Sequence, residues 1–314
     1  MILKGLAGLF LLPVIVSAAA FPADAPLYTL KQVGPGIFAA IATEHSRAGA
    51  NASFIIGPNG VAVVDTFEDA AAAKKLLEDI QAKTNLPVKF VVNTHYHLDH
   101  VAGNGVFADA GASVVAQHNV RGWLRTENLK FFGDKITPEQ RQMVESLALP
   151  DVVYQDALDL YLGTRLVKVR FYPGHTGGDS VVAVPDANVV MCGDLFWKRT
   201  IPNLIDASTK SWVETLEKLL AKYPTAVFVP GHGDVGGAAD VQAFHDYIAD
   251  LRSTIEQAQG AGKAGPNLMD TVFPTMQQKY GSWDFFNFFE KRNIEDTAAE
   301  LKGVKRIPTP APAD

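Results

Sequence analysis

The sequence predicts a mixed α/β fold in which two β-sheets pack face to face and helices cover their outer surfaces, an αββα sandwich formed by a single domain. Apolar, β-branched runs of strand length come first, helical patterns intervene, and the same alternation starts again after about residue 155. No short-period repeat and no interdomain linker interrupts the chain. With 314 residues and 47% hydrophobic content, the chain can bury the core that such a sandwich needs.

The first half is expected to contain one sheet and several helices. Residues 52–56 and 61–65 flank the segment Gly57–Gly60 (Gly-Pro-Asn-Gly), a strong hairpin signal. Residues 68–83 are rich in Ala, Lys and Leu and predict a helix that ends before Pro87. The other strands expected here are residues 27–33, 37–43, 88–93 and 113–116. A helical region around Trp123, a linker at residues 131–137 and a helix at residues 138–148 follow.

The second half repeats the alternation of strands and helices. The strands expected here are residues 158–162, 166–172, 181–184, 189–192 and 226–229. An amphipathic helix is expected at residues 208–222. The chain after Gly236 is expected to be helical, to carry a phenylalanine cluster at residues 285–289 and to pack as a cap on the sandwich. The domain is expected to span residues 21–305, and residues 306–314, rich in Pro and small residues, are expected to be disordered.

The first twenty residues predict a secretory signal peptide. Lys4 gives a positive start, residues 6–16 are mostly apolar, and residues 18–20 form an Ala-x-Ala cleavage site. The apolar run is too short to span a bilayer comfortably, so we expect no stable membrane insertion after cleavage, with an uncleaved anchor as the alternative. The expected location is the periplasm or the medium. A single cysteine, Cys192, leaves no internal disulfide.

One short stretch carries most of the chemical information. Residues 94–100 read Thr-His-Tyr-His-Leu-Asp-His, so His95, His97, Asp99 and His100 fall within six positions. Neutral imidazole and carboxylate are common zinc ligands, and burying four such groups without partners would cost free energy at each. His95 and His97 leave an extended segment on the same face, whereas Asp99 and His100 diverge. This spacing indicates one metal held by the first pair and a second metal held by the other pair.

Three further candidate ligands follow apolar strands. His175 and His232 both come after Pro-Gly, and Asp194 follows Cys192-Gly193 at the end of residues 189–192. Loops that leave strand ends are the usual place for binding sites. Several strands that all end in a ligand residue favour a shared site over incidental polar turns.

These motifs resemble the metallo-β-lactamase superfamily, whose pattern is His-x-His-x-Asp-His, Gly-His, Gly-Asp or Cys, and Gly-His. The similarity runs from about Asn51 to Asp234 and implies the αββα sandwich. It implies that the first metal is held by His95, His97 and His175. It implies a second metal held by Asp99, His100 and His232, and a carboxylate of Asp194 that bridges both. The implied cofactors are two Zn²⁺ ions, with a hydroxide between them as the nucleophile and Asp99 as a catalytic residue that orients it and passes a proton to the leaving atom.

The chain departs from one subgroup of that superfamily. Zinc β-lactamases with a thiolate ligand have Cys where this chain has Asp194, and Cys192 is better explained as a small buried strand residue. The oxygen-rich second site also accommodates iron or manganese. A bridging Asp is commoner in thioester, lactone and phosphodiester hydrolases of the superfamily.

Substrate recognition is expected beside Asp194. Trp197 can form an apolar wall there. Many β-lactamases of the superfamily have a carboxylate-binding lysine at the position of Trp197, and Lys198, one residue further, can bind a substrate carboxylate here. Asn203 follows as a third candidate. The formal net charge of −6 and the lack of a basic run argue against nucleic acid and favour a small-molecule substrate. The oligomeric state is not determined by these patterns.

Three functions fit the sequence. The first is an exported dinuclear zinc hydrolase that opens a cyclic amide or ester, as a β-lactamase or lactonase does. The second is a thioester hydrolase like glyoxalase II, which Asp194 suggests. The third, from another class, is a non-catalytic metal-binding accessory protein of a periplasmic redox or sulfur pathway.

Overall fold

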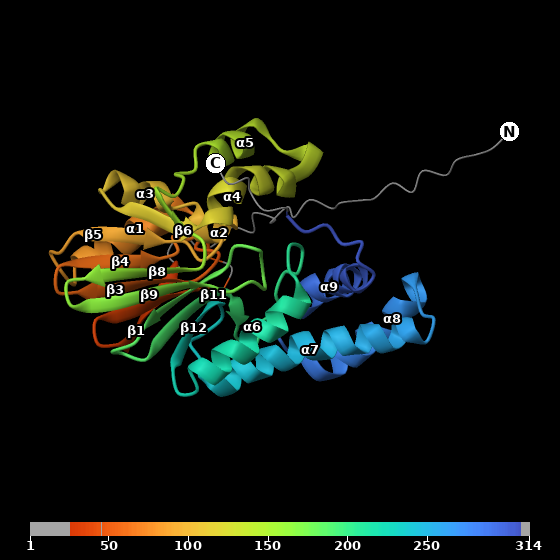
Figure 1. The fold of residues 1–314 in the computed structure, drawn as a ribbon. Helices are drawn as coiled ribbons and strands as arrows, with labels where there is room; N and C mark the ends of the chain where they lie inside the picture. Colours follow the sequence, from red (N-terminus) through yellow and green to blue (C-terminus); the bar gives the residue numbers. More distant parts are fainter. Residues whose placement is uncertain (1–25, 45, 309–314) are drawn as a thin grey trace.

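The computed structural model describes residues 26–44 and 46–308 and has the expected layered arrangement (Figure 1). The first sheet contains β1 (Tyr28–Gly34), β2 (Ile37–Ala42), β3 (Ala52–Gly57), β4 (Gly60–Val64), β5 (Val88–Val92), β6 (Ser113–Gln117) and β7 (Val152–Tyr154), in that order. Neighbouring strands from β1 to β4 pair antiparallel, and those from β4 to β7 pair parallel. The hairpin expected at Gly57–Gly60 joins β3 to β4.

The second sheet has the order β12-β11-β10-β9-β8. Its strands are β8 (Ala157–Leu162), β9 (Arg165–Phe171), β10 (Ser180–Val184), β11 (Val189–Trp197) and β12 (Val227–His232). β11 and β12 are parallel, whereas the other neighbours are antiparallel. The carboxyl ends of β11 and β12 therefore lie at the same edge of this sheet.

Alternating side chains divide the core between layers. Val182 and Met191 point into the core between the two sheets, where they meet Val64 and Val92 of the first sheet. Val190, one residue before Met191, instead packs under the helices that cover the second sheet. Because successive strand residues face opposite sides, β10 and β11, which are buried along their whole length, are covered on both faces. β8 and β9 carry charged residues and are partly exposed.

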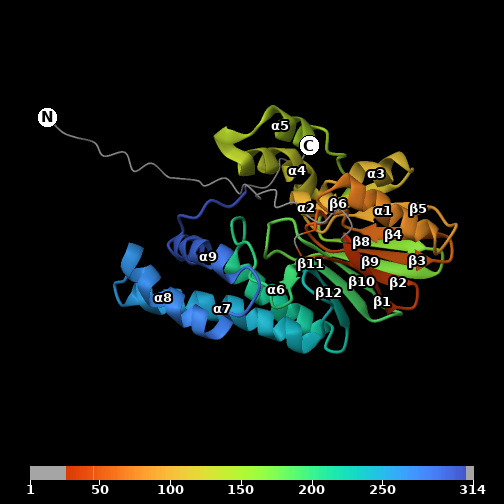
Figure 2. The same ribbon diagram turned by 180° about the vertical axis from the view of Figure 1, so that it is seen from behind.

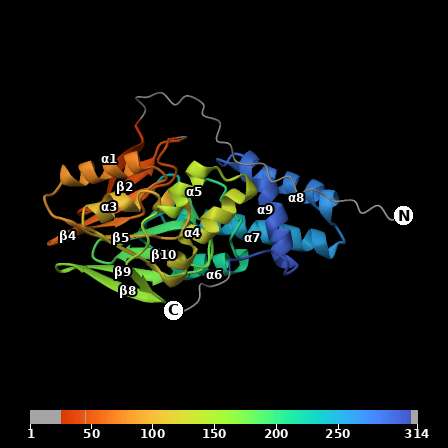
Figure 3. The same ribbon diagram turned by 90° about the horizontal axis from the view of Figure 1, so that it is seen from above.

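Helices cover both outer faces (Figures 2 and 3). The first sheet is covered by α1 (Ala70–Gln81) and α3 (Asn104–Asp109), with α2 (Leu98–Val101), α4 (His118–Phe132) and α5 (Pro138–Glu145) beside them. The second sheet is covered by α6 (Thr209–Lys222), α7 (Ala238–Gly260), α8 (Gly265–Tyr280) and α9 (Phe286–Leu301). Trp212 and Phe244 pack edge-to-face between α6 and α7, within the core that ties these helices to the sheet.

The sequence-based prediction missed the short elements and misplaced several ends. β7, α2 and α3 have three, four and six residues, too few to show a periodicity. The expected linker at residues 131–137 is instead the last turn of α4 followed by a 3₁₀ turn at Gly133–Lys135, and α5 ends at Glu145 rather than at residue 148. The strand expected at residues 189–192 continues to Trp197.

Parts of the prediction lie at or beyond the ends of the described chain. The expected signal peptide, residues 1–20, lies outside the described residues, as do residues 309–314 of the expected tail. Residues 306–308 have no regular secondary structure, and Arg306 pairs with Glu127 of α4. Within residues 26–44 and 46–308, no helix combines the length and apolar character needed to cross a bilayer.

Candidate metal centre

All seven predicted ligand residues meet at the edge of the sandwich where parallel strands end. The segment after β5 carries His95, His97, Asp99 and His100, and the loop between β9 and β10 carries His175. Asp194 lies on β11 and His232 ends β12. Two sheets therefore supply side chains to one place, although the residues span positions 95 to 232.

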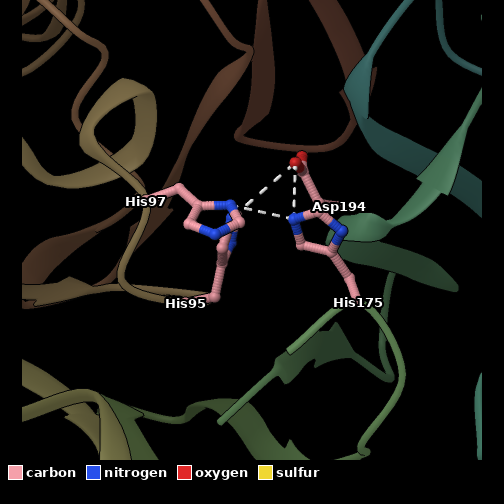
Figure 4. Close-up of side chains that lie close together, drawn as sticks. All are labelled: His95, His97, His175 and Asp194. Atoms are coloured by element: carbon pink, nitrogen blue, oxygen red, sulfur yellow. Dashed lines mark hydrogen bonds and ion pairs between the residues drawn. The ribbon is translucent and has the colours of Figure 1, made fainter. Parts of the chain in front are cut away.

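The first group consists of His95, His97, His175 and Asp194, whose side chains point toward one another (Figure 4). His175 Nε2 lies 2.9 Å from His97 Nδ1 and 3.3 Å from Asp194 Oδ2. His95 Nε2 lies 3.7 Å from the same carboxylate oxygen. Three imidazole nitrogens and one carboxylate oxygen thus converge, which is the donor set and number that zinc binds.

The second group consists of Asp99, His100 and His232. His232 Nε2 lies 3.3 Å from Asp99 Oδ2, and His100 Nε2 lies 3.6 Å from the same oxygen. The other oxygen of Asp194, Oδ1, is 3.0 Å from His100 Nε2 and 3.4 Å from His232 Nε2. Asp194 therefore directs one carboxylate oxygen to each group.

The atoms that face the centre of each group fit a bound cation. Within the described chain, the buried His95 Nε2, His100 Nε2, His232 Nε2 and Asp194 Oδ1 have no hydrogen-bond partner. Buried polar atoms without partners are rare because each costs free energy, and one metal ion in each group would satisfy these four atoms. The residues present therefore fit two metal ions that share Asp194.

Two glycines make the position of Asp194 possible. Gly193 has φ +50°, and a Cβ there would lie 2.3 Å from Thr94 Oγ1. The register of β11 against β12 shifts on both sides of Gly193, so the strand bulges and turns Asp194 toward the histidines. A Cβ on Gly231 would lie 1.9 Å from Asp194 Oδ1. Only glycine at residue 231 lets β12 pass this close to the carboxylate.

Two carboxylates that sequence reasoning missed orient the histidines. Asp65 Oδ2 lies 2.8 Å from His100 Nδ1, and Asp65 also accepts hydrogen bonds from the backbone and hydroxyl of Thr94. Asp206 Oδ2 lies 3.3 Å from His97 Nε2 and accepts a hydrogen bond from the Tyr96 hydroxyl. Each carboxylate faces one ring nitrogen and thereby directs the other nitrogen toward the centre, where it can bind a cation once it has lost its proton.

These two residues differ in how visible they are in the sequence. Asp65 ends an apolar strand, the same signal that marked Asp194, so that signal could have identified it. Asp206 lies between α6 and the end of β11 with no local pattern around it. Only the fold brings Asp206 to His97.

Burial and charge shift the pKa values of the site in two directions. Burial lowers the pKa of His95 well below its usual value and lowers that of His175 to about 3, so both imidazoles are neutral. For His232 burial acts the same way, but the carboxylates of Asp194 and Asp99 outweigh it and raise the pKa to about 9. The same carboxylates raise the pKa of His100 well above its usual value. Without a cation, protons therefore balance the carboxylates of the second group.

Of the three expected substrate residues, Trp197 contacts a candidate ligand with its side chain, whereas the side chains of Lys198 and Asn203 bind elsewhere. Trp197 is buried and stacks on His232, with ring centroids 3.8 Å apart. The Lys198 ammonium donates to the Val235 carbonyl and lies 3.5 Å from Asp240, so its charge is already paired. Asn203 accepts a hydrogen bond from the backbone of Ile205 and shapes its own loop.

Cys192 lies away from the ligand atoms, in the core beneath the helices of the second sheet. Although it is two residues before Asp194, the bulge at Gly193 separates the directions of the two side chains. Burial raises the pKa of its thiol, so the protonated form persists. This is the position of a small core residue.

Comparison with known proteins identifies the family. The sequence profile described as "Metallo-beta-lactamase superfamily" matches residues 46–232, more than half of the chain. The chain belongs to this superfamily. Its fold agrees with that assignment, because a structure described as a metallo-beta-lactamase from Pontibacter korlensis superposes with a TM-score of 0.59, covering 71% of this chain and 99% of the other at 24% identity.

Relatives in the superfamily have different named activities. A metallo-beta-lactamase type 2 from Bacteroides fragilis is 26% identical over 192 residues, which cover 60% of this chain and 70% of the relative. A linear primary-alkylsulfatase from a Pseudomonas species is 25% identical, covering 60% of this chain and 42% of the relative. A hydroxyacylglutathione hydrolase from Brucella anthropi is 27% identical, covering 52% and 53%. This chain thus spans about half or less of the last two, and the shared chemistry is metal-dependent hydrolysis.

Proposed function

We propose that this superfamily member is an exported dinuclear zinc hydrolase that opens a cyclic amide or ester in a small molecule. The observation that carries the proposal is the double contact of Asp194, whose Oδ2 faces His95 and His175 while its Oδ1 faces His100 and His232. A carboxylate shared in this way suits two cations held a few ångströms apart. Iron or manganese in place of zinc at the second group is the alternative that elemental analysis decides.

The residues of the chain have distinct roles in this proposal. When bound, two zinc ions supply a hydroxide nucleophile at neutral pH and polarise the bond under attack. Asp206 and Asp65 hold His97 and His100 in the tautomers that present a free nitrogen. Asp99 is the most exposed carboxylate of the site, with 27% of its side chain accessible, so it can orient the nucleophile and pass a proton to the leaving atom.

A second candidate is hydrolysis of a thioester. It is favoured by the carboxylate at residue 194, where thiolate-type β-lactamases have cysteine, and by the similarity to the Brucella anthropi hydroxyacylglutathione hydrolase. A metal-binding accessory role without turnover is the alternative outside catalysis.

One set of measurements separates the candidates. Purified mature protein is analysed for zinc, iron and manganese, and is then assayed with nitrocefin, an acyl-homoserine lactone and S-lactoylglutathione. We expect two metals per chain and hydrolysis of the β-lactam or the lactone. Turnover of the thioester alone would replace the first candidate by the second, and two bound metals without turnover would favour the accessory role.

A variant of the first group tests the mechanism. His97→Ala removes one imidazole from the first group, so we expect loss of one metal and of measurable turnover. The control is His245→Ala, because His245 lies on α7 and its ring contacts Gln242, Asp246 and Glu217 rather than the metal centre. Full activity in His97→Ala would contradict the proposed centre.

Export is a separate part of the proposal. It is supported by the charged start, the apolar run and the Ala-x-Ala site of residues 1–20. Intact mass of the protein recovered from the periplasm or medium should correspond to a chain that starts at Phe21. A chain that keeps residues 1–20 would contradict cleavage and favour an anchor.

A further inference from the structure

We infer that the start of α9 forms an aromatic wall that binds an apolar hydrocarbon tail on the substrate. The wall consists of four rings. Phe285 and Phe288 present their surfaces to solvent, and Phe289 and the buried Trp197 connect them to the metal centre. The inference rests on the proposed function, because it assigns a substrate class to the same metal centre. Three of these rings belong to the start of α9, which lies beyond residue 232, where the match to the superfamily profile ends.

The wall begins at a residue of the metal centre. The Trp197 ring stacks on the His232 ring, with centroids 3.8 Å apart and an angle of 27° between the ring planes. The Phe289 ring lies edge-on to Trp197, with centroids 6.5 Å apart. Phe288 lies 4.7 Å from Phe289, and Phe285 lies 5.8 Å from it. Successive ring contacts therefore run from a candidate metal ligand to the start of α9.

The wall ends at solvent. Phe285 and Phe288 are 42% and 57% exposed, whereas Trp197 is buried and Phe289 is partly buried. Adjoining exposed aromatic side chains at the edge of a site are unfavourable in water unless something covers them. Because the contact chain starts at the metal centre, the covering group that fits is a hydrocarbon part of a molecule whose reactive bond is held there.

The backbone holds Phe285 in place at a conformational cost. Its φ is +60°, in the left-handed region that residues with a Cβ disfavour. The preceding residue, Asp284, donates its backbone N–H to Arg199 and accepts from Ile201 at 2.9–3.0 Å. These hydrogen bonds attach the start of α9 to the chain just after Trp197, at the end of β11. Strain of this kind is retained where the surrounding structure fixes it, often at a ligand site.

The arrangement of layers agrees with this placement. Figures 1 and 2 show α9 grouped with α7 and α8 at one end of the molecule, and these two helices are its packing neighbours. Asn293 of α9 donates to the Pro202 carbonyl, and Lys305, just after α9, donates to the carbonyls of Leu204 and Ala207. α9 is therefore tied along its length to the loop that carries Asp206, the residue that orients His97.

The test measures binding to the zinc-loaded protein without requiring turnover. Acetohydroxamate and octanohydroxamate share a zinc-binding head and differ in tail length. Each methylene group removed from water contributes up to about fourfold in affinity, so a tail lying on one wall should raise affinity at least about tenfold overall. Isothermal titration should show this ratio in the wild type, and Phe288→Ala should reduce it severalfold while acetohydroxamate binds unchanged. Phe288→Leu, which keeps an apolar side chain, should retain most of the ratio.

The control variant is Tyr161→Ala. Tyr161 is 61% exposed but lies on β8, at the edge of the second sheet opposite β12, so the ratio should stay at its wild-type value. Equal affinity for the two hydroxamates, or an unchanged ratio in Phe288→Ala, would overturn the aromatic wall while leaving the metal centre intact. The wall would also be overturned, in favour of an interface between two copies of the chain, by one further result. In that result tail length has no effect on affinity, and the wild type is a dimer that Phe288→Ala converts to a monomer. Failure of both hydroxamates to bind would instead overturn the metal centre, and the wall with it.

Discussion

Asp206 is the residue whose removal most directly tests how the fold prepares the first group for a metal. Its Oδ2 holds His97 Nε2 at 3.3 Å, which leaves His97 Nδ1 facing His175 at 2.9 Å. Burial alone would raise the pKa of Asp206, but the hydrogen bond and charge of His97, together with the Tyr96 hydroxyl, hold it at about 2. The carboxylate is therefore ionised across the neutral range and acts as a fixed acceptor.

The expected loss of zinc affinity follows from the contacts of Asp206 with His97 and Tyr96. Asp206→Asn keeps an oxygen that accepts from His97 but removes the charge, so zinc affinity at the first group should fall about tenfold, or about 1.4 kcal/mol. Asp206→Ala removes the oxygen that contacts both His97 and Tyr96, frees the His97 ring to rotate and leaves the buried Tyr96 hydroxyl without this acceptor. Its loss should approach about a hundredfold, or about 2.8 kcal/mol.

The assay is competition for zinc against a chelator of known affinity, with thermal unfolding of the metal-free protein as a check on folding. The matched control is Asp186→Asn, because that carboxylate pairs with Arg165 on a surface hairpin and is 53% exposed. Its zinc affinity should equal that of the wild type. Zinc affinities within twofold of wild type in both Asp206 variants would refute the idea that this carboxylate orients His97.

Three further predictions concern protons, the thiol and a glycine. At about pH 7.5 the metal-free protein holds protons on His100 and His232, whose pKa values the neighbouring carboxylates raise, so zinc binding should release about two protons and weaken as pH falls. Titration in two buffers of different ionisation enthalpy measures this release, and equal heats would contradict it. Cys192→Ser should keep both metals by elemental analysis, because the thiol lies in the core, and loss of a metal would make it a ligand. Gly231→Ala places a Cβ against Asp194, so it should lower the free energy of unfolding in urea by about 1–3 kcal/mol and reduce the metal content. An unchanged urea midpoint and metal content would contradict the close approach of β12 to Asp194.

The long elements and the ligand cluster were predictable because their signals are local. The hairpin at Gly57–Gly60 joins two strands as expected, and the helix predicted at residues 68–83 forms as α1 between Ala70 and Gln81, where Asp69 caps its start. The family and the layered fold that the motifs implied are confirmed. The short elements α2, α3 and β7 were not predicted, because so few residues carry no periodicity and tertiary packing alone stabilises them.

The sequence by itself determined which residue types are available for metal chemistry, since a run such as His95 to His100 has few uses other than binding cations. It also indicated that apolar strands lead to His175, Asp194 and His232, although Asp194 lies within β11 rather than after it and His232 is the last residue of β12. Only the tertiary structure decided that Asp194 divides its two oxygens between the groups, that Asp206 reaches His97, and that the rings of α9 adjoin Trp197. Apart from the contact between His175 and Asp194, these outcomes depend on residues about 90 to 110 positions apart. Such contacts are fixed by how the sheets and helices pack rather than by any local preference of the chain.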